Sequence, residues 1–175
     1  RNQIAENVKL GTTKRAFDGG WNGGRILGYD NVENENGKKI LQVNEKEAEL
    51  IRLIFQESAI GKGYRAIANS LNRAGHRTKQ GNPFSTIAVK DILYNQTYIG
   101  KIQYNKFEKW ADKRRKGLSE NAFVVEGQHE AIVDAALWQK VQLKLKASSK
   151  HPSWNKTGTS VLTGLIRCPE CGSSM

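Results

Sequence analysis

The residues best placed for chemistry in this 175-residue sequence are Cys168 and Cys171, which form a Cys-x-x-Cys pair followed by glycine. Two thiolates at this spacing can hold one edge of a zinc ion, and a structural zinc site then needs two further ligands. A redox pair and two incidental thiols are the alternatives that the spacing leaves open. Because these are the only two cysteines, the chain has no disulfide framework, and we expect a reducing cytoplasm.

Positive charge is the second chemical feature of the sequence. Lys and Arg number 28 against 17 Asp and Glu, which gives a formal charge of +11. The excess is uneven: residues 62–82 hold five basic side chains and no acidic one, and residues 101–116 hold seven against two. This pattern favours contacts to phosphates of a polyanionic partner. Charge alone leaves open the alternative that these segments are only solvated loops.

Two predicted helices, a strand pair and a glycine-rich arm precede the basic segment at 62–82. Residues 1–13 predict a helix that ends at Gly11, and four glycines between residues 19 and 24 then indicate a loop or arm with close backbone approach. Segments 26–30 and 40–43 predict a short antiparallel pair. Asn44, with Glu47 three residues later, predicts the start of a strong helix that ends near residues 61–63. One face of this helix is predicted to be apolar, through Ala48, Ile51, Ile54, Phe55 and Ala59.

The next two helices give the outline of a helix-turn-helix. Apolar residues at helical spacing predict a helix over 64–74, and Ser85 is expected to cap another whose apolar stripe includes Val89 and Leu93. The turn between them is long for the tight version of this motif. Segments 98–104 and 122–126 predict two pairing strands, and Asp134 predicts the cap of a further helix.

These elements predict an α+β fold: a mixed helical domain with helix-turn-helix-like helices and a small antiparallel sheet. Residues 148–160 are rich in Ser, Lys, Thr and Gly and predict a linker, and residues 161–167 predict a strand leading into the cysteines. No apolar run approaches the roughly 20 residues that cross a bilayer, so we expect no membrane contact. The chain opens within a predicted helix and stops just after the cysteine pair, so we expect it to be part of a longer polypeptide.

In order along almost its whole length, the sequence resembles the segment that follows the catalytic domain in large serine recombinases, the serine integrases and transposon resolvases. The resemblance rests on spaced motifs rather than on any one of them. Phe84 departs from the family pattern, which usually has tryptophan there, and an aromatic side chain at this position is still expected to pack. The matching positions are residues 5–11, the arm through Gly28-Tyr29, Ile54-Phe55, Gly63, Ile67-Ala68, Leu71-Asn72, Gly75, Ser85, Val89, 92–95, 98–100, His129, Ile132-Val133 and 162–172.

The resemblance implies four segments. Residues 1–13 would be the end of the long helix from the catalytic domain, 14–147 the recombinase DNA-binding domain, 148–160 a linker and 161–175 the start of a truncated zinc ribbon. The family's catalytic serine attacks a DNA phosphodiester, and it would lie upstream of Arg1, so no serine here is assigned that role. Zinc is implied for the parent protein through Cys168 and Cys171, whose remaining ligands would lie outside this chain, and we expect none to be held by this fragment.

The implied function is recognition of a double-stranded attachment site, in partnership with the protein's own catalytic domain and other recombinase subunits. A non-enzymatic helix-turn-helix and zinc-ribbon regulator is the alternative, and a basic RNA-binding module is a third hypothesis. The arm would follow the DNA backbone or enter the minor groove, and the turn with the following helix would meet major-groove edges. The candidate DNA-contacting residues are Lys9, Thr12, Lys14, Arg15 and Arg25 for the first region, and Arg77, Thr78, Lys79, Gln80, Ser85, Thr86 and Lys90 for the second.

Aromatic and histidine side chains are expected mainly to hold the fold. His129 is predicted to be a buried or capping imidazole rather than a metal ligand. Tyr29, Tyr94, Tyr98 and Trp138 are predicted core residues rather than platforms for stacked bases. Trp21, within the glycine-rich arm, is the aromatic residue expected to anchor that arm to the domain.

Overall fold

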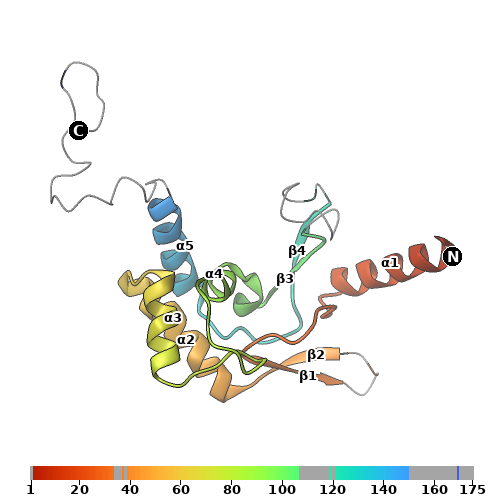
Figure 1. Ribbon diagram of the computed structural model, residues 1–175. Helices are drawn as coiled ribbons and strands as arrows, with labels where there is room; N and C mark the ends of the chain where they lie inside the picture. Colours follow the sequence, from red (N-terminus) through yellow and green to blue (C-terminus); the bar gives the residue numbers. More distant parts are fainter. Residues whose placement is uncertain are drawn as a thin grey trace. The chain divides into compact units, whose positions relative to one another are not determined.

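A computed structural model describes residues 2–33, 37, 39–106, 119, 121–149 and 169 of the chain. The chain divides into two compact units, Arg1–Val141 and Gln142–Met175. In the second unit, the described residues are 142–149, the last part of helix α5, and Pro169. The fold described below is that of the first unit, whose elements are labelled in Figure 1.

Helix α1 (Asn2–Phe17) continues past Gly11, so the predicted end of this helix is wrong. Helix packing, rather than the local glycine signal, decides where the helix ends. Ala16 is fully buried, and the ring of Phe17 stacks on Phe123 with 4.2 Å between centroids. These contacts stabilise about one and a half further turns of helix. The predicted segment boundary after residue 13 therefore falls within α1.

Strands β1 (Tyr29–Glu33) and β2 (Lys39–Val43) form the expected antiparallel hairpin. The register pairs Tyr29 with Val43 and Glu33 with Lys39. The first strand begins three residues later than expected because Gly28, with φ +93°, turns the chain at the end of the arm. A β-carbon at Gly28 would lie 2.8 Å from Ile132 Cδ1, so only glycine fits where the arm meets the core.

Helix α2 (Glu45–Ile60) begins and ends where the sequence predicts. The Asn44 side chain accepts a hydrogen bond from the Glu47 backbone N–H, and Gly61 ends the helix in the left-handed conformation. The reciprocal half of the capping box is not formed, because the Glu47 carboxylate accepts from Gly28 N instead, at 2.9 Å. The predicted apolar face is confirmed, since all its members are buried: Ala48, Ile51, Ile54, Phe55 and Ala59.

Helices α3 (Tyr64–Arg73) and α4 (Thr86–Tyr94) form the predicted helix-turn-helix outline, and α2 packs against both. Ser85 caps α4 by accepting a hydrogen bond from Ala88 N at 3.0 Å, as expected. The long connection is held near its end, just before the Ser85 cap, by Phe84, which is 4% exposed. Phe84 therefore packs as an aromatic residue at this position was expected to do.

A 3-10 turn (Gln96–Ile99) separates α4 from strand β3 (Lys101–Tyr104), which pairs antiparallel with β4 (Phe123–Glu126). The sequence predicted that the strand would begin at Tyr98, and this is wrong. The Asn95 side chain accepts from Thr97 N at 3.1 Å and so caps the turn, which holds Tyr98 in the core. Helix α5 (Ala135–Ser149) then begins at the predicted cap, where Ala136 N donates to the Asp134 carboxylate.

Candidate nucleic-acid interface

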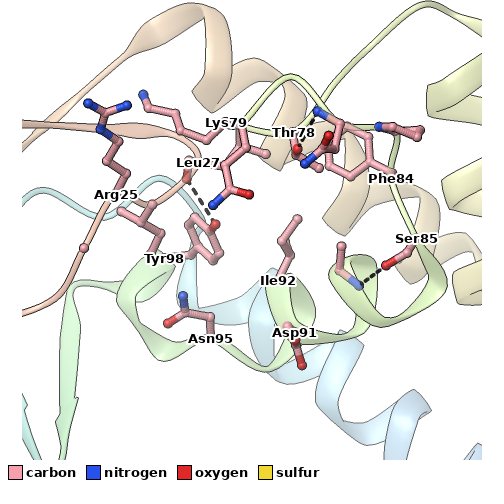
Figure 2. A pocket seen from close by; sticks show the side chains of 16 residues that line it. Arg25, Leu27, Thr78, Lys79, Phe84, Ser85, Asp91, Ile92, Asn95 and Tyr98 are labelled. Carbon is pink, nitrogen blue, oxygen red and sulfur yellow. Dashed lines mark hydrogen bonds between the residues drawn. The ribbon is translucent and has the colours of Figure 1, made fainter.

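An open cleft of about 730 Å³ lies where the arm, the helix-turn-helix connection and α4 meet. Figure 2 shows Arg25 of the arm and Lys79 of the connection on one side of it, with Asp91 and Asn95 on the α4 side. Tyr98 closes the interior, where its hydroxyl donates to Leu27 O at 3.0 Å. Arg25 of the first candidate region and residues 78–80 of the second therefore border one cleft.

The arm reaches this cleft as a backbone fixed at both ends. At its start, Gln128 N donates to Gly19 O at 3.1 Å, and at its end Asn44 N donates to Gly28 O at 3.0 Å. Trp21, expected to anchor the arm to the domain, donates its indole N–H to Gly24 O at 3.0 Å, which folds the arm on itself. Arg25 is exposed between these fixed ends.

The connection between α3 and α4 is a built loop rather than a loose one. Thr78 N donates to Asn82 O at 2.8 Å, and the Thr78 hydroxyl accepts from Asn82 N at 3.2 Å. Asn72 on α3 clamps the Phe84 backbone with two hydrogen bonds, of 2.7 Å from its N–H and 2.9 Å to its carbonyl. Gln80 lies exposed at the tip of this loop.

Helix α4 presents its first two turns to solvent. Thr86, Ile87 and Lys90 are exposed there, while Val89 and Leu93 on the opposite side are fully buried. Ile87 is 64% exposed although it is a large apolar side chain. An apolar group between polar neighbours at the start of a helix is a surface suited to the edges of base pairs, including the methyl group of thymine.

Lys79 differs from the other basic candidates because its charge is already compensated. Its ammonium lies 2.7 Å from Asp30 Oδ1, and 2.9 and 2.7 Å from the two carboxylate oxygens of Glu47. Desolvation opposes its charged form, but the hydrogen bonds that it donates to Asp30 and Glu47 outweigh this effect and raise the Lys79 pKa. The Lys79 hydrogen bond in turn lowers the pKa of Asp30, with help from Asn44.

The α1 candidates lie apart from the cleft, on the last turns of that helix. Lys9 and Lys14 are exposed. The Thr12 hydroxyl bonds the Val8 and Lys9 carbonyl oxygens and lies 2.9 Å from Tyr104 Oη, so it is engaged within the fold. Arg15 is half-buried, and its aliphatic stem lies against Gly20, where a β-carbon would be 2.8 Å from Arg15 Cγ.

The structure thus divides the candidate residues. Arg77, predicted at the DNA, donates to His76 O at 2.7 Å and does not line the cleft. Three further polar residues, which the sequence did not mark as candidates, line the cleft. In the sequence they differ from other polar residues only by lying next to the predicted turn and helix. The candidates that line the cleft are Arg25, Thr78, Lys79, Gln80 and Ser85, the missed residues are Asn82, Asp91 and Asn95, and Thr86 and Lys90 lie exposed on α4 outside the lining.

The aromatic and histidine residues mostly hold the fold, as predicted. His129 is buried, and its Nε2 lies 2.8 Å from Thr97 O. Burial lowers the His129 pKa, which the hydrogen bond to Thr97 partly offsets. Tyr29 and Tyr98 are fully buried, and desolvation raises the pKa of each hydroxyl well above its usual range.

Two further aromatic predictions had different outcomes. Trp138 is half-buried and packs on the buried Phe55 with 5.6 Å between ring centroids, so it lies at the edge of the core. Tyr94, predicted to be buried, is 39% exposed, so that prediction is wrong. Tyr94 lies at the end of α4 and hydrogen-bonds Tyr64 of α3, and desolvation, with that bond, raises the Tyr64 pKa to about 12.

The predicted zinc ligands Cys168 and Cys171 lie outside the described residues, as do the predicted strand at 161–167 and the basic run at 109–116. Within the described ranges, no group of three or more His, Cys, Asp or Glu side chains is arranged to hold a metal ion. In that same part of the chain, no helix combines the length and apolar character needed to span a membrane.

Comparison with known proteins gives consistent results. A protein of Bacillus subtilis (strain 168) named "Putative DNA recombinase" is 27% identical over 165 residues, covering 86% of this chain and 32% of that protein. Two solved structures each match with a TM-score of 0.66 and 25% identity over 96% of this chain. One is described as the crystal structure of an LSR–DNA complex and the other concerns sequence requirements of the Listeria innocua prophage attP site.

This chain covers 48% and 63% of those two structures, so it spans only part of the length of its relatives. The family model described as Recombinase matches residues 45–148, more than half of the chain. That range begins with α2 and takes in the helix-turn-helix connection, α4 and both strands of the second hairpin. The chain therefore belongs to the Recombinase family.

Proposed function

We propose that this chain is the part of a serine site-specific recombinase that recognises a double-stranded DNA attachment site. The observation that carries the proposal is the cleft in which Arg25 of the arm, the connection at 78–82 and the start of α4 lie together. The family match, and the likeness to structures described as an LSR–DNA complex and as concerning an attP site, support the same function.

The arm at the cleft and the exposed face of α4 beside it would divide the work of recognition. Arg25 is exposed on a glycine-rich backbone, which suits close approach to phosphates or entry into a minor groove. Thr86, Ile87 and Lys90 are exposed at the start of a helix that is packed firmly on α3, which suits contacts to base edges in the major groove. Contacts to the DNA phosphates would supply most of the affinity, and contacts from α4 to the bases would supply most of the sequence selectivity.

DNA cleavage and rejoining would be the work of the parent protein rather than of this chain. The resemblance implies a catalytic serine in a domain upstream of Arg1, and the chain's own residues would then bind and align the DNA. Its own catalytic domain and other recombinase subunits would be its protein partners. The exposed basic residues of α1, Lys9 and Lys14, would then approach the DNA backbone between the recognition cleft and the catalytic part.

We further propose that Cys168 and Cys171 supply half of a structural zinc site in the parent protein, which would work in the cytoplasm. The support is their spacing, which suits one edge of a tetrahedral zinc ion. Zinc bound by this chain alone should be weak, because two of four ligands are present. Calorimetric titration of the chain with zinc checks this, and tight binding at one ion per chain would reject the half-site assignment.

Equilibrium binding to labelled random duplex DNA, single-stranded DNA and double-stranded RNA, each at two salt concentrations, tests the proposed function. We expect duplex DNA to bind most tightly, with affinity falling steeply as salt rises because phosphate contacts release counterions. Preference for single strands or for A-form RNA would instead favour an RNA-binding module. Weak binding to all three would reject the nucleic-acid assignment of the cleft.

A further inference from the structure

We propose that Lys79 is a positioning residue, which locks the arm and the helix-turn-helix connection into one DNA-facing unit and makes no phosphate contact of its own. The inference rests on the proposed function and deepens it. It also distinguishes Lys79 from the other basic candidate residues, because the charge pattern of the sequence treats them all alike. Three observations support it: all three N–H donors of the Lys79 ammonium are used, two carboxylates surround it, and it links the connection to β1 and to α2.

The ammonium of Lys79 has no donor to spare. A lysine ammonium carries three N–H donors, and three carboxylate oxygens lie within 2.9 Å of Lys79 Nζ: one of Asp30 and both of Glu47. Its side chain is only 18% exposed. A phosphate could be reached only by breaking one of these bonds, whereas the exposed Arg25 nearby on the same side of the cleft can reach it directly.

The charge around Lys79 supports the same role. Asp30 and Glu47 carry two negative charges beside a cleft proposed to hold a polyanion, and Lys79 reduces their sum to one. Without Lys79, both carboxylates would repel the DNA and each other. Lys79 thus reduces the electrostatic repulsion between the cleft and phosphates by compensating one of the two carboxylate charges, while other residues make the phosphate contacts.

Lys79 joins segments that are far apart in the sequence. Its partners lie 49 and 32 residues away, on β1 and on the first turn of α2. Glu47 also accepts from Gly28 N at 2.9 Å, at the end of the arm. Asn44 donates to Asp30 Oδ2 at 2.7 Å, so both carboxylates are themselves held. One ammonium therefore fixes the connection at 78–82 directly against β1 and α2, and through Glu47 against the end of the arm.

The variant Glu47→Gln tests this inference by the direction of its effect. Glutamine keeps an oxygen to accept from Gly28 N, but it removes the negative charge that holds Lys79. If Lys79 acts by positioning, duplex affinity should fall about tenfold, as for the loss of a charge-assisted hydrogen bond. If Lys79 instead contacts phosphate, the change frees its ammonium and removes a charge that repels DNA, so affinity should stay equal or rise.

Glu49→Gln is the matched control, since Glu49 is an exposed acidic residue of the same helix and the charge change is identical. It should leave duplex affinity unchanged or slightly raised. A second variant, Lys79→Met, is examined by the salt dependence of binding. Loss of a phosphate contact would reduce the slope of log affinity against log salt by about 0.9, and a positioning role predicts a lower affinity with the wild-type slope.

Each result decides between the two roles. A Glu47→Gln affinity about tenfold below that of Glu49→Gln, with an unchanged slope for Lys79→Met, supports the inference. Equal or tighter binding by Glu47→Gln, or a slope reduced by about 0.9 for Lys79→Met, overturns it while leaving the proposed function intact. If the wild-type chain shows no preference for duplex DNA, the proposed function fails and this inference fails with it.

Discussion

Lys79 and Lys90 lie eleven residues apart and belong to the same group of candidate DNA-contacting residues, yet the structure gives them opposite surroundings. Lys79 is enclosed by Asp30 and Glu47, and its three donors are satisfied. Lys90 is exposed on the second turn of α4, beside the similarly exposed Thr86 and Ile87. The first lysine builds the edge of the cleft, and the second is available to a ligand.

The difference between these lysines shows what a count of charges leaves out. The same net positive charge contains cations that hold the protein together and cations that it offers to a partner, and only their neighbours separate the two groups. Paired cations should affect DNA binding through shape and stability, and exposed cations through contacts.

The largest effect is expected for Phe84→Ala, because this change removes the buried side chain that anchors both the connection at 78–82 and the start of α4. Phe84 is 4% exposed, and Asn72 clamps its backbone between the connection at 78–82 and α4. The free energy of unfolding should fall by about 3–5 kcal/mol, as for other buried aromatic truncations. Chemical denaturation measures this change, and Ile87→Ala at the exposed surface is the control, with an expected loss below about 0.5 kcal/mol.

Lys90→Ala should narrow the difference in affinity between a cognate and a random duplex without altering stability. The expected loss of discrimination is about 1–3 kcal/mol if Lys90 contacts base edges. Competition binding with both duplexes measures it. The control is Lys62→Ala, because Lys62 follows the C-terminal end of α2 and pairs with Glu57 at 2.6 Å. If both variants discriminate equally well between the cognate and the random duplex, the exposed residues of α4 do not form the surface that contacts the bases.

Ile87→Ala should reduce selectivity at a thymine in the site, because the exposed isoleucine is suited to contact the thymine methyl group. The expected loss is about 1 kcal/mol, close to the burial of a methyl group. Selection of bound sequences from a randomised duplex pool identifies the thymine. Replacing that thymine by uracil should then weaken the wild-type chain but leave Ile87→Ala unaffected, and an equal loss in both would contradict the contact.

The smallest effect concerns pH and the buried His129. Burial lowers its pKa in the folded chain, so the unfolded chain binds a proton more readily. Stability should therefore be complete above the unfolded value of about 6.5 and decline as pH falls below it. Thermal unfolding between pH 7.5 and 5 measures the decline. His129→Gln should flatten it, the exposed His76→Asn should leave it unchanged, and a decline that is identical in all three would contradict the assignment.

The sequence predicted the features of this fold that depend on neighbouring residues. The caps at Asn44, Ser85 and Asp134 and the apolar faces of α2 and α3 are all confirmed, because a cap needs only the next three backbone N–H groups. The end of α1 was wrong because packing of Phe17 on Phe123, more than a hundred residues away, overrides the signal of Gly11.

The candidate site was predictable in its location but not in its internal pairing. The glycine-rich arm, the basic connection and the start of α4 were all marked by the sequence, and the cleft brings them together. The ion pairs of Lys79 could not be foreseen, since both partners come from other elements. Asn82, Asp91 and Asn95 were missed because small polar residues beside a turn carry no distinctive signal in the sequence.

The most direct test of the central claim is the ratio of affinities for an attachment-site duplex and a random duplex, measured by competition at one physiological salt concentration. If the arm, the connection and α4 form a surface that recognises sequence, the attachment-site duplex should bind at least about a thousandfold more tightly. A ratio near one would show that the cleft contacts only phosphates, and it would contradict the account of α4 as the reading helix.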